Sequence, residues 1–383
     1  MIAPYGGRLV ARELPEPERV RLDGERRDLP TVRPPIDALY DAEKIGIGAY
    51  SPLSGFMDRE TVRTVTTTGR LPDGTPWPMP ILFPVPPDPV AQALGPGDAV
   101  GLVDASDRLI ALLHIQEAFP LDRGGIARAV YGTDDPNHPN VADLLGGPDR
   151  AWSGRIDLVR RLGLPGGRAE PSPAELREEF ARRGWARVAG YQCRNPPHTA
   201  HEYLQRLTLE REDVDGLLIH PVVGRLKAGD YRPEVILEAY DALVHHYYPS
   251  DRVALAPLTI TMRYGGPKAA LFFAIVRRNY GCSHYIVGRD QAGVGKYYDP
   301  YACHRIFDAF DVGVTPLRYD ESFFCRRCGG MASARTCAHP SSERAATSQT
   351  RIRAALESGE PLPPEILRPE VAEVLRRPRA TLG

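Results

Sequence analysis

The chain has 383 residues, of which 42% are hydrophobic, and its formal net charge at neutral pH is −1. This length predicts two or three globular domains, and the near-neutral charge gives no basis for binding nucleic acid or a membrane surface. No apolar run approaches the roughly 18 residues that a transmembrane helix needs, and the first residues lack the apolar core of a signal peptide, so we expect a cytoplasmic protein.

Residues 1–165 are predicted to form a β-rich domain. The segments 99–104 and 109–115 are short, rich in Val, Ile and Leu, and bounded by Gly, Asp and Pro, which is typical of strands. His138, in the polar stretch 130–141, is interpreted as a loop histidine rather than a catalytic one. The segment 157–173 contains Gly and Pro and predicts a domain boundary.

Residues 166–317 are predicted to form a second domain, in which strands and helices alternate. Predicted helices cover 172–183, 232–248 and 267–280, and predicted strands cover 188–191, 216–220, 253–258 and 284–287. Ser172 is a typical N-cap for the first of these helices. Helices of this length between short apolar strands indicate right-handed βαβ units and a parallel sheet. Ligands of such sheets bind at the carboxyl ends of the strands.

Four loops follow these strands, at residues 192–201, 222–230, 259–267 and 288–295. Each contains an arginine, and these are Arg194, Arg225, Arg263 and Arg289. Because the loops belong to one edge of a parallel sheet, we expect them to converge on an anion. Lys227 adds a further positive charge, although 222–230 can also be interpreted as a solvated basic loop. The glycines of 288–295 would let backbone N–H groups approach a ligand, but GVGK lacks the spacing of a P-loop.

The stretch 188–206, VAGYQCRNPPHTAHEYLQR, predicts a strand, a turn and the start of a helix. The two prolines after Asn195 fit a first helical turn, where a missing N–H costs nothing. His198 and His201, three residues apart, would then project from the same side of the helix. Together with the free N–H groups and the helix dipole they would form a site for a polyphosphate. Two alternatives are histidines that are simply packed, or one half of a zinc site.

Residues 318–383 are predicted to form a third, small part of the chain. They contain Cys325, Cys328, Cys337 and His339, with the spacing C-x2-C-x8-C-x-H. Three thiolates and one imidazole are a closed set of ligands for structural zinc, with no open position for water. The alternative is a cysteine cluster without metal. Disulfide bonds between these cysteines are not expected, because the compartment is reducing.

The segment QCRNPPHTAH, at residues 192–201, resembles the Q-[TS]-R-N-P-x-H-x-x-H signature of the ATP sulfurylase (sulfate adenylyltransferase) family. SPLSGFM (51–57) and residues 130–141 resemble segments of its PUA-like domain, and VVGRLKAGD, MRYGGPKAA and GRDQAG resemble further family segments. The zinc set resembles that of some bacterial members. The resemblance implies an α/β protein in three parts: a PUA-like β-rich domain (1–165), a Rossmann-like nucleotidyltransferase domain with a parallel sheet (166–317) and a small C-terminal α/β zinc-binding domain (318–383).

The resemblance also implies a reaction, in which sulfate attacks the α-phosphate of ATP to give adenosine 5′-phosphosulfate (APS) and pyrophosphate. The implied catalytic residues are Cys193, Arg194, Asn195, His198 and His201. Sulfate would be bound by Gln192, Arg194 and Ala292. The nucleotide would be bound by Gln192, Asn195, His198, His201, Gly288, Arg289, Asp290 and Gln291. Mg²⁺ is expected with ATP, zinc as a structural ion, and a homodimer as the assembly.

Two positions depart from the family pattern. Cys193 stands where the family has Thr or Ser, so a thiol replaces a hydroxyl, which is the better hydrogen-bond partner. Gln291 stands where the family has His, so no positive charge can develop there. These departures leave open a catalytically weak paralogue that binds ATP or APS for regulation. A nucleotidyltransferase with another acceptor is a further alternative, which the pair Gln192 and Arg194 disfavours. The sequence does not determine whether the cell runs the reaction towards APS or towards ATP.

Overall fold

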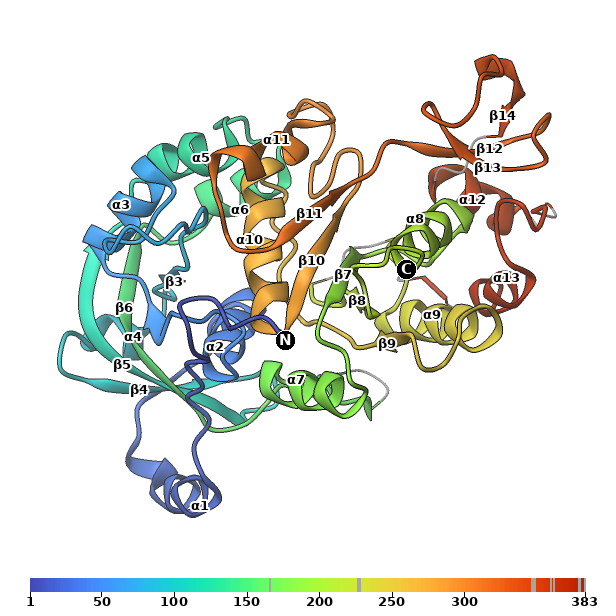
Figure 1. Ribbon diagram of the computed structural model, residues 1–383. Coiled ribbons are helices and arrows are strands. Elements are labelled where there is room, and N and C mark those ends of the chain that lie inside the picture. The colour runs from blue at the N-terminus through green and yellow to red at the C-terminus, as the bar shows by residue number, and fades with distance from the viewer. Residues whose placement is uncertain are drawn as a thin grey trace.

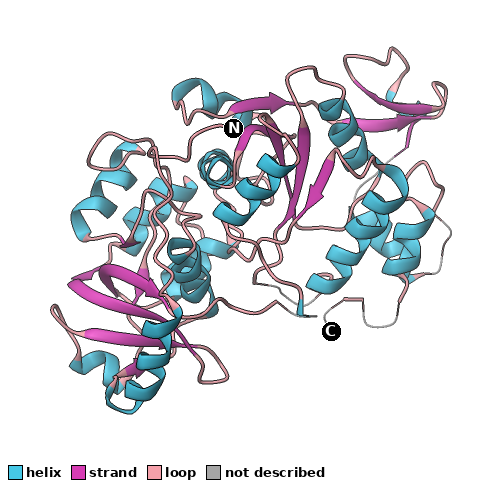
Figure 2. Ribbon diagram, turned by 60° about the horizontal axis from the view of Figure 1, so that its bottom comes forward, coloured by secondary structure: helices cyan, strands magenta, loops and turns pink. Residues whose placement is uncertain are grey.

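The computed structural model describes residues 1–164, 167–225, 229–345, 349–358, 360, 362–377 and 380–381. Three sheets lie in separate regions of the molecule, with helices between and around them (Figure 1, Figure 2). None of the described helices combines the length and the apolar character that crossing a bilayer requires.

The N-terminal sheet has six strands in the order β1-β4-β5-β6-β2, with β3 also paired to β6. Its strands are β1 (Thr31–Val32), β2 (Gly55–Phe56), β3 (Phe83–Pro84), β4 (Ala99–Val103), β5 (Leu109–Pro120) and β6 (Arg150–Leu158). The two long strands, β5 and β6, pair in antiparallel fashion along most of their length. Gly154 of β6 lies close to the backbone of β5: a Cβ there would lie 1.9 Å from the carbonyl oxygen of His114, so only glycine fits.

Six described helices accompany this sheet, and the sequence did not predict them. They are α1 (Glu16–Glu25), α2 (Ile36–Gly46), α3 (Arg59–Thr68), α4 (Pro89–Ala93), α5 (Arg123–Tyr131) and α6 (Pro139–Gly146), with a short 3₁₀ turn, η1 (Arg26–Asp28). The helix α2 shows why periodicity failed here. Its polar residues Asp41, Glu43 and Lys44 are buried, so they do not mark a solvent face.

The central sheet has five parallel strands in the order β11-β10-β7-β8-β9, and the predicted parallel sheet is confirmed. The strands are β7 (Val188–Cys193), β8 (Gly216–Pro221), β9 (Val253–Leu255), β10 (Cys282–Val287) and β11 (Thr315–Arg318). Its helices are α7 (Pro173–Arg182), α8 (Thr199–Leu209), α9 (Pro233–Tyr247), α10 (Pro267–Asn279) and α11 (Ala302–Ala309). The chain proceeds from β7 to β9 on one side and returns to β10 on the other. The strand order therefore reverses between β7 and β10, where ligands of open α/β sheets bind.

The helix α7 is specified by residues at its own start, whereas α10 is held by contacts with distant parts of the chain. The helix α7 begins with a capping box, in which the side chain of Ser172 accepts from Glu175 N at 3.3 Å and that of Glu175 accepts from Ser172 N at 2.5 Å. The helix α10 is buried along nearly its whole length and lies between the two larger sheets (Figure 1). At its end, Asn279 Nδ2 donates to the carbonyl oxygens of Ala49 and Ser51, both at 3.0 Å. The N-terminal and central parts thus share one core.

The C-terminal part carries a small antiparallel sheet in the order β13-β12-β14. Its elements are β12 (Ser322–Cys325), β13 (Gly330–Ser333), the 3₁₀ turn η3 (Ser341–Glu343), β14 (Arg344–Ala345), α12 (Gln349–Glu357) and α13 (Pro369–Leu375). Arg368, the N-cap of α13, forms a salt bridge of 2.7 Å with Glu202 on α8. The start of α13 therefore contacts α8, at whose N-terminus the two candidate histidines lie.

Candidate active site

Two adjoining cavities, about 410 and 540 Å³ in volume, open at the carboxyl ends of β7 and β10. Both are lined by a shared set of residues, which comprises Gln192, Cys193, Arg194, Asn195, His201, Arg289 and Gln291. His198 and Gly288 line the first cavity, and Asp290 and Ala292 line the second. Every residue that the family resemblance assigned to the two substrates thus lies on these cavities.

The two histidines lie side by side at the start of α8. His198 is the N-cap of the helix, and its ring stacks on that of His201 with centroids 3.8 Å apart. Both Nδ1 atoms are buried, and neither has a hydrogen-bond partner among the described residues. Burial lowers the pKa of His201 to about 4, and burial together with the neighbouring His201 lowers the pKa of His198 well below its usual value. Both imidazoles are therefore neutral at pH 7 in the free protein.

The N-terminus of α8 is less open than the sequence suggested. The helix begins at Thr199, after both prolines, and not within the Pro-Pro pair. The backbone N–H of Thr199 donates to the carbonyl oxygen of Ile366 at 3.1 Å, and its hydroxyl donates to that of Glu365 at 2.7 Å. One N–H of the first turn is therefore already satisfied by the C-terminal part of the chain.

Arg194 lies at the edge of the second cavity in a fixed orientation. Its Nη2 contacts both carboxylate oxygens of Asp230, at 2.9 and 2.8 Å, and its guanidinium lies 5.4 Å from the ring centroid of Tyr264. A guanidinium with a salt bridge on one side and an aromatic face beside it loses little conformational freedom when it binds an anion. Arg194 is thus already held in place for such a ligand.

Two of the four predicted anion-binding arginines point elsewhere, and that part of the prediction is wrong. Arg263 is paired with Asp41 of α2 at 2.5 and 2.7 Å and lies against the ring of Phe272. Arg225 is paired with Asp37 at 3.0 Å and with Asp143 at 2.7 Å. Both side chains join the central part to the N-terminal part of the chain. Lys227, named with Arg225, lies outside the described residues.

The loop after β10 brings Arg289 to both cavities. This side chain is about half exposed, and its Nη1 lies 3.7 Å from Glu321 Oε1. The backbone of the loop is left-handed at Asp290 and Ala292, each with a φ of 56°. Such a conformation is uncommon outside glycine and clusters at functional sites. These two left-handed residues are not among the glycines of this loop, and the predicted approach of its backbone N–H groups to a ligand stays a prediction.

The side chain of Cys193 faces away from the amide of Gln192, as expected for successive residues of a strand. Its thiol contacts the hydroxyl of Tyr240, and burial raises the pKa of Cys193 to about 12. The thiol therefore stays protonated and does not act as a thiolate. Nearby, Tyr240 Oη donates to the carbonyl oxygen of Asn195 at 3.3 Å.

His138 is buried at the N-cap of α6, where its Nδ1 accepts from Val141 N at 3.4 Å and its Nε2 donates to the carbonyl oxygen of Tyr264 at 2.9 Å. It does not line either of the two cavities. The interpretation of His138 as non-catalytic is in keeping with this packing.

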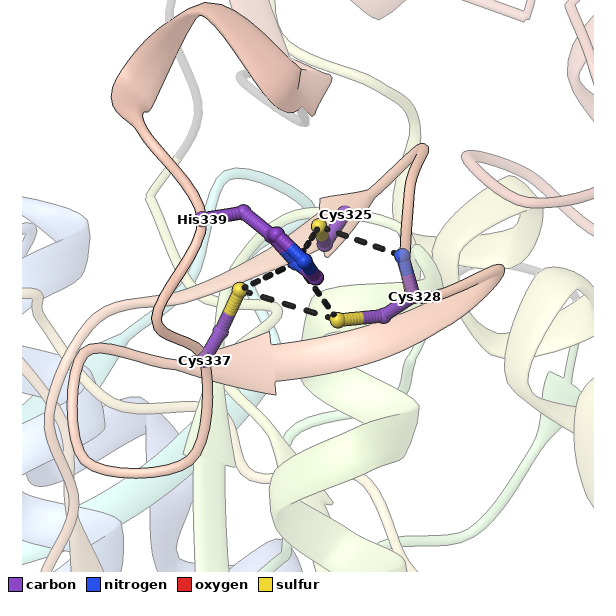
Figure 3. Close-up of side chains that lie close together, drawn as sticks. All are labelled: Cys325, Cys328, Cys337 and His339. Carbon is purple, nitrogen blue, oxygen red and sulfur yellow. Dashed lines mark hydrogen bonds between the residues drawn. The ribbon is translucent and has the colours of Figure 1, made fainter.

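A second group of candidate ligands lies at the small C-terminal sheet, at the end of β12 and in the turn and loop that follow. The sulfur atoms of Cys325, Cys328 and Cys337 and the ring of His339 converge on one point (Figure 3). The Cys328–Cys337 sulfur distance is 3.7 Å, and Nδ1 of His339 lies 3.1 to 3.6 Å from the three sulfurs. A tetrahedral zinc site with Zn–S bonds of about 2.3 Å has edges of roughly 3.8 Å. The four donors therefore fit one metal ion.

Comparisons with known proteins decide the family. Residues 168–378 match the family model ATP-sulfurylase, and residues 2–161 match the PUA-like domain. The sulfate adenylyltransferase of Symbiobacterium thermophilum is 46% identical over 377 residues, which cover 98% of this chain and 95% of the relative. The chain belongs to the ATP sulfurylase family. The sulfate adenylyltransferase of Cenarchaeum symbiosum is 42% identical over 381 residues, covering 99% of this chain and 98% of its own.

The family gives the reaction class as well as the fold. This ATP sulfurylase is a nucleotidyltransferase with sulfate adenylyltransferase activity, as the sequence predicted. The solved structure of a hexameric APS kinase from Thiobacillus denitrificans superposes with a TM-score of 0.76 at 26% identity, covering 98% of this chain and 68% of that one. The PUA-like domain and the central α/β domain are therefore confirmed.

Sequence reasoning missed several residues that line the cavities of this ATP sulfurylase. Asp320 and Glu321 follow β11, the strand that was not predicted, and so reach the same edge of the sheet. Arg353 reaches the second cavity from α12, and its guanidinium lies 5.3 Å from the ring of Tyr231. Only Asp320 and Glu321 could have been found from the sequence. Had residues 315–318 been predicted as a strand, this acidic pair would have been expected at the carboxyl edge of the sheet.

Proposed function

We propose that the two cavities bind ATP and sulfate side by side and that the adenylyl group passes directly between them. The observation that carries this proposal is that the two cavities have lining residues in common. Gln192, Arg194 and Arg289 border both cavities, so two anions bound there would be adjacent. Positioning two reactants in this way can supply a large part of the barrier reduction.

Sulfate binds, in this proposal, to Gln192, Arg194 and the backbone N–H of Ala292. Arg194 supplies a fixed guanidinium that suits a dianion. The amide of Gln192 supplies neutral donors, and the left-handed backbone at Ala292 orients the N–H groups of this loop. Because sulfate is already ionised, no general base is needed to activate it.

The phosphates of ATP bind to His198 and His201 in the first cavity, with further contacts from Asn195, Gly288, Arg289, Asp290 and Gln291. A sulfate oxygen attacks the α-phosphorus in line, the new phosphate–sulfate bond forms and pyrophosphate leaves. The neutral imidazoles donate hydrogen bonds to the leaving group, and the negative charge that develops there favours their protonation. Cys193 does not form a covalent intermediate and only lines the site. Mg²⁺ bound with ATP would neutralise charge on the phosphates.

We further propose that the Cys3His cluster binds structural zinc. All four protein ligands of a closed tetrahedral site are present, so no position remains for catalytic water. We retain the division into domains at 1–165, 166–317 and 318–383, because β11 ends at Arg318 and the zinc-binding hairpin begins at Ser322. We also retain a cytoplasmic homodimer as the proposed form, with its assembly testable by light scattering.

The test is a coupled assay of pyrophosphate release with sulfate, with molybdate and without an acceptor. Release that requires both ATP and sulfate supports transfer, and molybdate should replace sulfate because it is also a tetrahedral dianion. A protein that binds ATP or APS but releases pyrophosphate at no more than the acceptor-free rate would support the regulatory alternative. The same enzyme given APS and pyrophosphate should form ATP, which tests the reverse direction.

A further inference from the structure

Tyr285 lies directly behind the proposed sulfate subsite. It is fully buried on β10, in parallel register opposite Gly190 of β7. Residues opposite each other in a sheet project to the same face, and so do residues two apart in one strand. The ring of Tyr285 therefore lies on the face from which the side chain of Gln192 projects.

The hydroxyl of Tyr285 joins two amides. Gln291 Nε2 donates to it at 3.3 Å, and it donates to Gln192 Oε1, also at 3.3 Å. An amide nitrogen can only donate, and a phenol has a single proton. Burial raises the pKa of Tyr285 to about 12, so the hydroxyl keeps that proton at neutral pH. The chain of hydrogen bonds from Gln291 through Tyr285 to Gln192 therefore has one direction.

This direction decides which end of the Gln192 amide is left for a ligand. Oε1 is occupied by Tyr285, while Nε2 has only Met262 Sδ, at 3.9 Å, as its contact among the described residues. N–H donors stabilise an oxyanion, whereas an amide oxygen in the same place would repel it. We propose that Tyr285 is a positioning residue that presents the N–H groups of Gln192 to sulfate. The inference rests on the proposed sulfate-binding role of Gln192.

The same geometry gives Gln291 a role that needs no positive charge. At this position the family pattern has a histidine, which can also offer an N–H donor. The amide of Gln291 donates to Tyr285 and so starts the chain of hydrogen bonds. The departure from the family pattern is thus compatible with an ordered sulfate subsite.

The experiment compares Tyr285→Phe with Tyr280→Phe. Tyr280 is a matched control, because it is also fully buried and its hydroxyl also donates one bond of 3.3 Å, to Glu170, a residue outside both cavities. Tyr285→Phe should raise the KM for sulfate roughly 3- to 10-fold, the effect of one lost hydrogen bond. Its KM for ATP should stay close to that of the wild type. Tyr280→Phe should change neither KM, although its melting temperature should fall.

Two further variants make the test decisive. Gln291→Glu replaces the donor by an acceptor of the same shape, which reverses the chain, but it also adds a negative charge beside both anions. It should raise the KM for sulfate at least as much, and this rise supports the positioning role only if Tyr285→Phe raises the KM as well. Gln192→Ala tests the subsite itself, and an unchanged KM for sulfate there would overturn both the subsite and the role of Tyr285. If Gln192→Ala raises this KM while Tyr285→Phe and Gln291→Glu do not, the subsite stands and the positioning role is refuted. An equal rise in Tyr280→Phe would also refute it, because the effect would then be one of general destabilisation.

Discussion

The substitution His201→Asn separates a catalytic from a structural role for the stacked histidines. His201 borders both cavities, and its buried Nδ1 has no partner among the described residues, so the ring is available to a ligand. Removing one donor from a site that excludes water typically lowers kcat by about 10²–10³-fold, or roughly 3–4 kcal/mol. We expect a loss of this size in sulfate-dependent pyrophosphate release, with a smaller change in the KM for ATP.

The pH dependence of stability gives a second, independent measure of the same residue. The pKa of His201 is lowered from 6.5 to about 4, so between these values the unfolded chain binds more protons than the folded one. The contribution of His201 to stability is therefore present above pH 6.5 and is lost as the pH falls towards 4. From this shift the wild type should lose about 2 kcal/mol between pH 8 and pH 5 through His201. His201→Asn should lack this loss.

The kcat for pyrophosphate release and the free energy of unfolding are measured on one sample. The first comes from the coupled assay, and the second from urea unfolding at pH 5 and pH 8. The control is His246→Asn, a substitution of an exposed histidine on α9 outside both cavities. A fall in kcat of less than about fivefold, together with a lower melting temperature, would show that the pair only packs the helix start. The phosphate site would then have to be assigned to Arg289 and the neighbouring backbone alone.

Three further predictions concern Arg194, the Cys3His cluster and Arg263. Arg194→Ala should abolish sulfate-dependent turnover while circular dichroism shows an intact fold, because a dianion needs the fixed guanidinium; wild-type kinetics in the purified variant would contradict this. Protein purified without added metal should contain about one zinc per chain by elemental analysis, and Cys328→Ser should lose the metal and melt at a lower temperature, whereas a zinc-free wild type would exclude the site. Arg263→Met should lower the free energy of unfolding by roughly 3–5 kcal/mol, because it leaves the buried carboxylate of Asp41 without a cationic partner, and the KM values for ATP and sulfate should barely change. A selective rise in the KM for ATP or for sulfate would show instead that Arg263 contributes to anion binding.

Predictions that rest on neighbours in the chain agree with the structure. Ser172, the predicted N-cap, begins α7, because the capping box that it forms with Glu175 lies within four neighbouring residues. The predicted Cys3His donors converge because all four lie between residues 325 and 339, in and directly after one short hairpin. His198 and His201 stack because they occupy the N-cap and N3 positions of α8, whose side chains lie close together at a helix start.

Tertiary structure decided what depends on distant partners. The sequence shows that Arg194 and Arg263 follow strands of one sheet, but only folding pairs Arg263 with Asp41, more than 200 positions away, and leaves Arg194 at the cavity. The charge of His201 was likewise open, since its pKa depends on the water that the surrounding chain excludes. The sequence by itself determined the alternation of strands and helices from α7 to β10, the motif from Gln192 to His201 and the Cys3His set, all of which are local patterns. Packing determined the partner and protonation state of each side chain, because electrostatic energies depend on burial and on neighbours that only the folded chain brings together.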